Sequence, residues 1–211
     1  MRSHHASLVL HRLRARYPAP RTQLNWTTPW ELLVATMLSA QTTDARVNHV
    51  TPELFARWPT PAHLAQAELA DIEGVIHSTG FFRAKARHLQ ATARILQERF
   101  GGNVPQTMAE LLTLPGVARK TANIVLSNAF GIHEGIAVDT HVKRVSFRLG
   151  LTTATQPDRI ERDLMGLFPR PTWGDLNHYL VLFGREVCLA RKPRCTACPL
   201  ADICPRNGVP L

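Results

Sequence analysis

The amino-acid sequence predicts an all-α protein. No segment shows sustained alternation of apolar and polar residues, as a half-buried β-strand would. Several segments instead place apolar residues at helical spacing, and residues typical of helix ends flank them. No internal repeat or low-complexity segment interrupts this pattern.

The predicted helices can be justified in chain order. A basic N-terminal helix ends before Pro18 and Pro20, which cannot continue it. Thr28 is a typical N-cap, Pro29 suits the first helical position, and an apolar run then continues through Leu38. The next helix is predicted to begin near Thr43, and a longer one to cover 82–100 before Gly101 and Gly102. A short helix is then predicted to end at Leu114, and another to begin near Ala118. The last two are predicted to cover 140–149, before Gly150, and 173–187.

The composition is that of a soluble globular protein, and its charge favours a nucleic-acid partner, with a protein that is merely soluble and basic as the alternative. Its 211 residues suffice for one or two domains, and no run approaches the roughly 18 apolar residues that span a bilayer. Twenty-five Lys and Arg against 16 Asp and Glu give a net charge of +9, which suits a polyanion. Aromatic residues make up 7% of the chain, too few for a platform that stacks the bases of single strands.

All four cysteines lie near the end of the chain, as Cys188, Cys195, Cys198 and Cys204 in a C-x6-C-x2-C-x5-C pattern. Two disulfides fit poorly, because the chain is large enough to fold without them and begins without a secretory signal. Structural zinc usually takes two tight Cys-x2-Cys knuckles, and only Cys195 and Cys198 form one. The spacing, which ends in Cys-Pro, therefore favours an iron–sulfur cluster and leaves zinc open.

The segment LPGVARKTA, residues 114–122, predicts a tight turn between two helices. Gly116 can adopt backbone angles that are closed to other residues. The turn leads into a helix N-terminus, where N–H groups and the helix dipole favour an anion such as a phosphate. A phosphate contact of this kind would bind DNA without reading its bases. From the turn alone, an ordinary helix–turn–helix connection is the alternative.

Lys120 and Asp139 are the candidate chemical groups. Lys120 is expected to share a polar helix face with Asn123 and Ser127, and the helix dipole together with partial burial would favour its neutral, nucleophilic amine. The alternative is a solvated surface lysine. Asp139 lies where a helix begins, so it is expected to be an N-cap. A carboxylate held there could also stabilise positive charge on a sugar or take part in proton transfer.

Together, the hairpin at 114–122, the segment Val138–His141 and the four-cysteine loop resemble the endonuclease III family of helix–hairpin–helix DNA glycosylases. The motifs occur in the family's order, and the resemblance covers the chain from about Trp30 to Pro205. It implies a [4Fe–4S] cluster on the four cysteines, Lys120 as the catalytic nucleophile and Asp139 as the catalytic carboxylate.

The resemblance also implies a fold of two all-α domains with a DNA-binding groove between them. The first is a six-helix barrel, residues 23–133, which carries the hairpin. The second joins residues 1–22 to 134–211 and holds the cluster loop. Because the expected chemistry needs only a lysine and a carboxylate, we expect the cluster to act as a scaffold that presents basic residues to DNA.

The implied function is base-excision repair. The enzyme would remove oxidised pyrimidines through a Schiff base at Lys120 and then cleave the abasic site by β-elimination. Its partner would be double-stranded DNA with damaged bases or abasic sites, and we expect a monomer in the cytoplasm, at the nucleoid in a bacterium. The residues expected to contact DNA are Gln41, Asp44, Phe81, Gly116, Ala118, His141, Arg144, Arg191, Lys192 and Arg194, with Arg148 as a further phosphate contact.

Two of these contacts are expected to enter the duplex. Gln41 matches the residue that fills the space left by the extruded base. Phe81 falls where the family often places a leucine wedge, and a core aromatic is the alternative for it. Ala118 replaces the usual second glycine of the hairpin, and the joint 131–135 is slightly longer than usual, which could alter phosphate contact and lesion preference.

Other functions remain open at this point. An adenine-mismatch or other monofunctional glycosylase would share the fold, although Lys120 and the lack of an additional C-terminal domain argue against it. A non-catalytic iron–sulfur protein that binds DNA is the alternative from another class.

Overall fold

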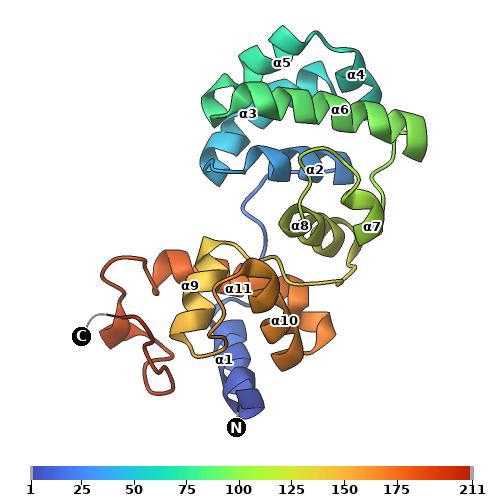
Figure 1. The fold of residues 1–211 in the computed structure, drawn as a ribbon. Coiled ribbons are helices and arrows are strands. Elements are labelled where there is room, and N and C mark those ends of the chain that lie inside the picture. Colours follow the sequence, from blue (N-terminus) through green and yellow to red (C-terminus); the bar gives the residue numbers. More distant parts are fainter. Residues whose placement is uncertain (1, 210–211) are drawn as a thin grey trace. The chain divides into compact units, whose positions relative to one another are not determined.

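The computed structural model describes residues 2–209, and this part of the chain is helical and contains no β-strand (Figure 1). The predicted fold class is confirmed. The α-helices are α1 (Arg2–Arg16), α2 (Pro29–Leu38), α3 (Asp44–Arg57), α4 (Pro61–Gln66), α5 (Leu69–Ile76), α6 (Phe82–Phe100), α7 (Met108–Leu111), α8 (Arg119–Phe130), α9 (Thr140–Arg148), α10 (Pro157–Leu167) and α11 (Trp173–Glu186). Short 3-10 helices are η1 (His77–Thr79), η2 (Arg170–Thr172) and η3 (Cys195–Ala197).

The chain divides into two compact units, each with its own hydrophobic core. Thr22–Ile132 contains α2 to α8. Met1–Arg21 and His133–Leu211 together contain, in their described residues, α1, α9 to α11 and the cysteine loop. The boundaries expected from the sequence differ from these by one residue at each joint.

The unit Thr22–Ile132 is built around α2. All of this helix from Leu32 to Leu38 is buried, along with Trp30, and it packs against α3, α6 and α8. A helix that is apolar on every face must be surrounded by other elements. Its apolar sequence therefore placed it at the centre of the unit.

The other unit packs α9 against α11, and α1 against α10 and α11. Its helices are amphipathic, and α10 buries Ile160 and Leu164 on one face. Two surface ion pairs anchor α1. Arg12 bonds to Asp202 in the cysteine loop, and Arg16 lies 3.0 Å from Glu186 at the end of α11. Within residues 2–209, no helix is long and apolar enough to cross a membrane.

Capping signals predicted the helix ends well. The hydroxyl of Thr28 accepts a hydrogen bond from the Glu31 N–H at 3.2 Å, and Pro29 is the first residue of α2. Gly101 ends α6 in the left-handed region, with φ of 58°. The ends predicted at Leu149 and Val187 lie one residue beyond α9 and α11, because each of these residues is the C-cap.

Four elements differ from the sequence prediction or were missed. The helices α4 and α5 span only 6 and 8 residues, too short for a periodic pattern to identify them. The helix α10 was not predicted, although Pro157 at its start and apolar residues at helical spacing are typical of a helix. The helix expected to end at Leu114 ends instead at Leu111, and a hydrogen bond from Leu114 N to Leu111 O closes a turn there.

Candidate active site and cluster centre

The turn before α8 has the geometry that its glycine predicts. Gly116 has φ of 77°, and a Cβ at this position would lie 2.9 Å from Nδ1 of His88 on α6. The turn is also tied to α6, because the hydroxyl of Thr92 donates to Pro115 O at 2.9 Å. No other residue type could occupy position 116 without strain and a clash. The turn before α8 is thereby held against the long helix α6.

The start of α8 carries no side-chain cap. Ala118 is its N-cap residue, with extended angles (φ −96°, ψ 169°) that alanine adopts freely, so replacement of glycine here costs no backbone strain. A methyl group cannot satisfy the first N–H groups of the helix. An anion placed at this helix start would therefore meet unshielded N–H dipoles.

Lys120 lies in the first turn of α8 and is exposed. Of the two alternatives for its side chain, partial burial and a solvated surface, the structure has the second, and the position in the first turn is confirmed. The predicted polar face is also only partly correct, because Asn123 is buried with 3% of its surface exposed and Ser127 is half-buried. The exposed amine of Lys120 is accessible to a macromolecular substrate.

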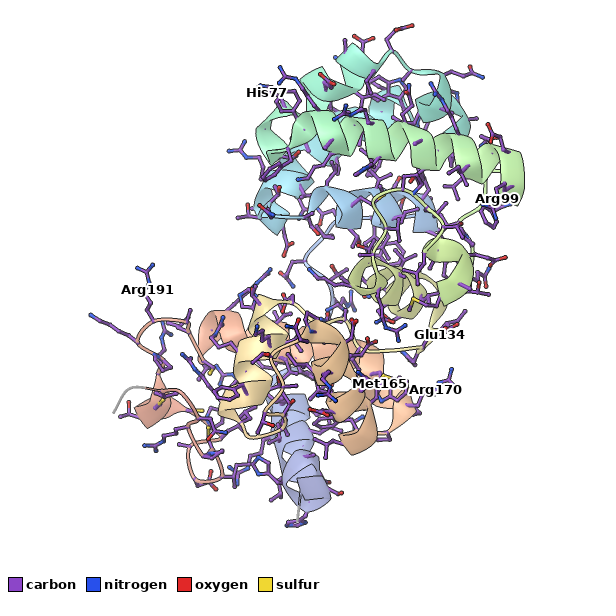
Figure 2. The ribbon with its side chains drawn as sticks, viewed as in Figure 1. His77, Arg99, Glu134, Met165, Arg170 and Arg191 are labelled. Atoms are coloured by element: carbon purple, nitrogen blue, oxygen red, sulfur yellow. The ribbon has the colours of Figure 1, made fainter. Side chains whose placement is uncertain are left out.

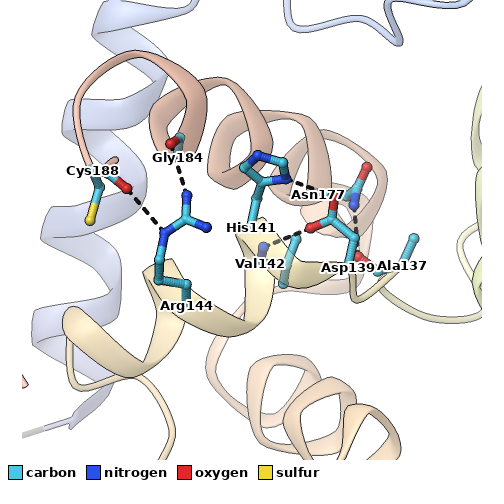
Figure 3. A network of polar contacts seen from close by, with 8 residues as sticks. All are labelled: Ala137, Asp139, His141, Val142, Arg144, Asn177, Gly184 and Cys188. Carbon is cyan, nitrogen blue, oxygen red and sulfur yellow. Dashed lines mark hydrogen bonds and ion pairs between the residues drawn. The ribbon is translucent and has the colours of Figure 1, made fainter. Parts of the chain in front are cut away.

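Asp139 is the N-cap of α9, as predicted. Its Oδ1 accepts a hydrogen bond from the Val142 N–H at 2.8 Å, and its Oδ2 lies 3.2 Å from Nδ1 of His141 (Figure 3). Its side chain is 18% exposed. Both oxygens thus have neighbours within the first turn of the helix, and the carboxylate has one well-defined orientation.

The segment before Asp139 is held by two buried polar residues. Asn177 on α11 donates to Ala137 O at 2.7 Å (Figure 3). The Ile136 N–H donates to Glu161 on α10 at 3.1 Å. Both side chains are at most 6% exposed. Sequence reasoning missed them, because one Asn and one Glu within amphipathic helices give no local signal that they face inward.

Arg144 on α9 connects this helix to α11 and the cysteine loop. Its Nη2 donates to Gly184 O at 2.8 Å and its Nε donates to Cys188 O at 3.2 Å (Figure 3). A Cβ on Gly184 would lie 3.0 Å from that Nη2, so the glycine makes room for the guanidinium. Burial lowers the pKa of Arg144 below its ordinary value. Its contact with DNA stays a prediction.

Arg148 does not hold a phosphate as expected. It is 6% exposed, and its guanidinium donates to Leu189 O at 2.6 Å, to Ala190 O at 3.0 Å and to Cys188 Sγ at 3.5 Å. A buried guanidinium with these partners cannot reach DNA. It instead fastens the start of the cysteine loop to α9, since it bonds three consecutive residues of that loop.

The four cysteines line one pocket of about 320 Å³, part of which is open to solvent. No disulfide links them. The N–H groups of Leu200 and Arg206 each lie 3.4 Å from a cysteine sulfur, on Cys198 and Cys204 respectively. Such donors stabilise a thiolate. Burial raises the pKa of these two thiols, so a bound metal must displace their protons.

Four thiols around one pocket of about 320 Å³ suit an iron–sulfur cluster as a donor set. Tetrahedral zinc needs all of its thiolates at about 2.3 Å from one ion. The thiolates of a cubane cluster bind different irons, so they surround a larger group without meeting at a point.

The basic residues of the cysteine loop are on the surface. Arg191, Lys192 and Arg194 are exposed, and Figure 2 shows Arg191 pointing away from the loop. Lys192 has φ of 50°, which turns the chain sharply between Cys188 and Cys195. The loop therefore presents cations to solvent.

In the unit Thr22–Ile132, Gln41 lies in the loop between α2 and α3, and Phe81 lies in the loop between η1 and α6. Both are exposed, and Phe81 is 68% exposed, so it is not the core aromatic that was the alternative. Asp44 is the first residue of α3 and is half-buried. The structure thus brings Gln41 and Phe81 to the surface of one unit, and the other unit carries His141, Arg144 and the basic loop.

The fold and site define a DNA repair protein of the HhH-GPD class. Residues 34–170 match the model of the HhH-GPD superfamily of base excision DNA repair proteins. Residues 188–204, which begin and end at cysteines, match the iron–sulfur binding domain of endonuclease III.

Individual proteins and solved structures that are similar to this chain identify the family within the HhH-GPD superfamily. The chain is 57% identical to endonuclease III of Synechocystis over 95% of this chain and 91% of that protein. It is 40% identical, with a TM-score of 0.92, to a non-covalent endonuclease III–DNA complex, over 97% of this chain and 95% of the other. A trapped endonuclease III–DNA covalent intermediate gives the same identity and TM-score, with 96% of that chain covered. The chain belongs to the endonuclease III family.

The expected function class and cofactor are thereby confirmed. The protein is a base-excision-repair DNA glycosylase and lyase, and residues 188–204 are the binding domain of its [4Fe–4S] cluster. A non-catalytic DNA-binding protein is no longer an alternative.

Proposed function

We propose that the protein excises oxidised pyrimidines from double-stranded DNA and cleaves the resulting abasic site through a Schiff base on Lys120. The observation that carries this proposal is the exposed amine of Lys120 in the uncapped first turn of α8, directly after the Gly116 turn. An exposed primary amine at this position can reach a macromolecular substrate and attack a sugar carbon as a nucleophile. The covalent intermediate trapped for a similar endonuclease III supports the same chemistry here.

In the proposed reaction, the damaged base is first extruded, which costs less for a damaged base than for a sound one. The amine of Lys120 attacks the sugar C1′, and the base leaves with the electron pair of the C1′–N bond. Asp139 stabilises the positive charge that develops on the sugar. The lysine nitrogen then loses a proton, and its lone pair expels O4′, which takes up a proton as the sugar ring opens and the Schiff base forms. Loss of a proton from C2′ expels the 3′ phosphate, and hydrolysis of the Schiff base releases the enzyme.

Two exposed residues would fill the duplex after extrusion. Phe81 is an exposed aromatic on a short loop, the kind of side chain that wedges between base steps. Gln41 can hydrogen-bond the base left without a partner. The unshielded start of α8 and the cations Arg191, Lys192 and Arg194 would bind phosphates, so affinity should fall steeply with salt. We further propose that the protein acts as a monomer in the cytoplasm.

Borohydride trapping on an abasic duplex tests the nucleophile. The chain has only four lysines, so a complete panel is possible: Lys85→Ala, Lys120→Ala, Lys143→Ala and Lys192→Ala. Only Lys120→Ala should abolish the covalent adduct, at protein concentrations that saturate the duplex. An adduct that survives in Lys120→Ala would exclude this residue as the nucleophile.

A lesion panel tests the substrate. Duplexes with an oxidised pyrimidine should lose the damaged base and be cleaved, and duplexes with adenine opposite an oxidised guanine should stay intact. Excision of the adenine without strand cleavage would instead favour the monofunctional alternative. Size-exclusion chromatography with light scattering checks the monomer.

A further inference from the structure

The loops that carry Gln41 and Phe81 have strained tips. Gln41 has φ of 55° and Phe81 has φ of 48°, and only two other non-glycine residues among 2–209 have positive φ. A bulky residue such as Phe adopts this region only when its surroundings hold it there. Neither tip is held by its own side chain, because both side chains are exposed. The restraint must come from the bases of the loops.

A single buried ammonium lies between these two loop bases. Lys85 on α6 is 8% exposed, and its Nζ donates to Leu38 O at 2.8 Å, to Thr42 Oγ1 at 2.8 Å and to Thr79 O at 2.9 Å. An ammonium has three N–H donors, and each one here has an acceptor. Burial also lowers the pKa of Lys85. A surface lysine kept for solubility would show neither the burial nor the full set of partners.

The three acceptors of the Lys85 ammonium lie at the ends of the two loops. Leu38 is the last residue of α2, Thr42 follows Gln41, and Thr79 ends η1 two residues before Phe81. The hydroxyl of Thr42 also donates to Thr79 O, which joins the two loops directly. Leu38 O is a carbonyl that α2 leaves without a helical partner, so the cation also favours that helix end. Lys85 thus fixes the spacing between one loop and the other.

We propose that Lys85 is a positioning residue that holds the Gln41 and Phe81 loops in the arrangement needed to enter the duplex. This inference rests on the proposed function, in which those loops fill the gap left by the extruded base. Base excision requires a paired base to leave the stack, whereas an abasic site has no base to extrude. Loss of the clamp should therefore slow excision much more than it slows cleavage of a preformed abasic site.

The test compares the two reactions in Lys85→Met, which keeps the length and apolar stem of the side chain. Single-turnover excision of an oxidised pyrimidine should fall by about tenfold or more, as expected when charge-assisted hydrogen bonds are lost, and lyase cleavage of an abasic duplex should change less than about threefold. A 2-aminopurine base next to the lesion should also show less unstacking in the variant complex. Equal loss in both reactions, or no loss of excision, overturns the proposal.

Thr42→Val provides a second, milder variant in case Lys85→Met does not fold. It removes the hydroxyl shared by Lys85 and Thr79 and keeps the buried charge, and it should show the same selective loss of excision. Arg87→Met is the matched control, because Arg87 lies on α6 and is exposed. It removes the same charge and should leave the ratio of excision to lyase cleavage unchanged. If the ratio of excision to lyase cleavage in Thr42→Val equals that of the wild-type protein, the proposal is overturned.

Phe81→Ala and Gln41→Ala separate this inference from the function it rests on. If either one lowers excision and Lys85→Met does not, the loops act in the duplex without the clamp and only the inference fails. If neither lowers excision and Lys85→Met does, the effect of Lys85 does not pass through the loops, and both the inference and the proposed insertion fail.

Discussion

One pair of substitutions can separate the N-cap role of Asp139 from its proposed catalytic role. As N-cap of α9 it accepts a hydrogen bond from Val142 N at 2.8 Å, and as a carboxylate it is proposed to stabilise charge on the sugar. Asparagine caps a helix about as well as aspartate, and loss of the charge near the helix dipole costs about 0.3–1 kcal/mol. Alanine loses the cap as well, at about 0.5–2 kcal/mol.

The two variants should therefore differ in stability and agree in activity. For a chain of this size about 1 kcal/mol shifts the melting temperature by roughly 2–4 °C, so Asp139→Ala should melt several degrees below wild type and Asp139→Asn by less. Both should lose about 10²–10⁴ in single-turnover excision, because neither carries a carboxylate. Thermal denaturation followed by circular dichroism and excision of an oxidised pyrimidine give the two readouts.

A cap outside the proposed chemistry is the control. Thr28 caps α2 at 3.2 Å, so Thr28→Ala should lower the melting temperature and leave the excision rate near that of wild type. Excision by Asp139→Asn within about threefold of the wild-type rate would refute the catalytic role. A melting temperature of Asp139→Asn equal to that of Asp139→Ala would refute the capping argument.

Three further outcomes are expected. Gly116→Ala should destabilise the fold by about 1–3 kcal/mol, because position 116 has φ of 77° and the new Cβ would clash with His88. Gly74→Ala, in a helix with open space around it, should instead stabilise the fold by about 0.5–1 kcal/mol. Equal melting temperatures of the two variants would contradict this argument. Burial lowers the pKa of His178 below its ordinary 6.5, so the unfolded chain binds a proton that the folded chain does not, and stability is lost as the pH falls below 6.5. The melting temperature of His178→Gln should then fall less steeply than that of wild type between pH 7 and 5, and parallel curves would rule the argument out. Cys198→Ser should lose iron and visible absorbance and keep the helical signal of Thr22–Ile132; full iron content would exclude this thiol as a ligand.

The sequence predicted features that depend on neighbours along the chain. Thr28, Gly101 and Asp139 mark helix ends through bonds to residues a few positions away, and Gly116 marks a turn through its own φ. Short helices such as α4 escaped prediction, because 6 residues cannot show a helical period. The sequence left the exposure of Lys120 open between partial burial and a solvated surface, because burial depends on everything that packs around a side chain.

The sequence by itself determined the helical fold class, the turn before Lys120, the N-cap at Asp139 and the four thiols of the cluster loop. These follow from local propensity, capping and spacing. Only the tertiary structure decided that Arg148 serves the cysteine loop rather than DNA and that Lys85 is buried between two loops. Their partners are distant in the chain, 47 positions for Lys85 and Leu38, and a long side chain gives no local sign of which carbonyl it will meet.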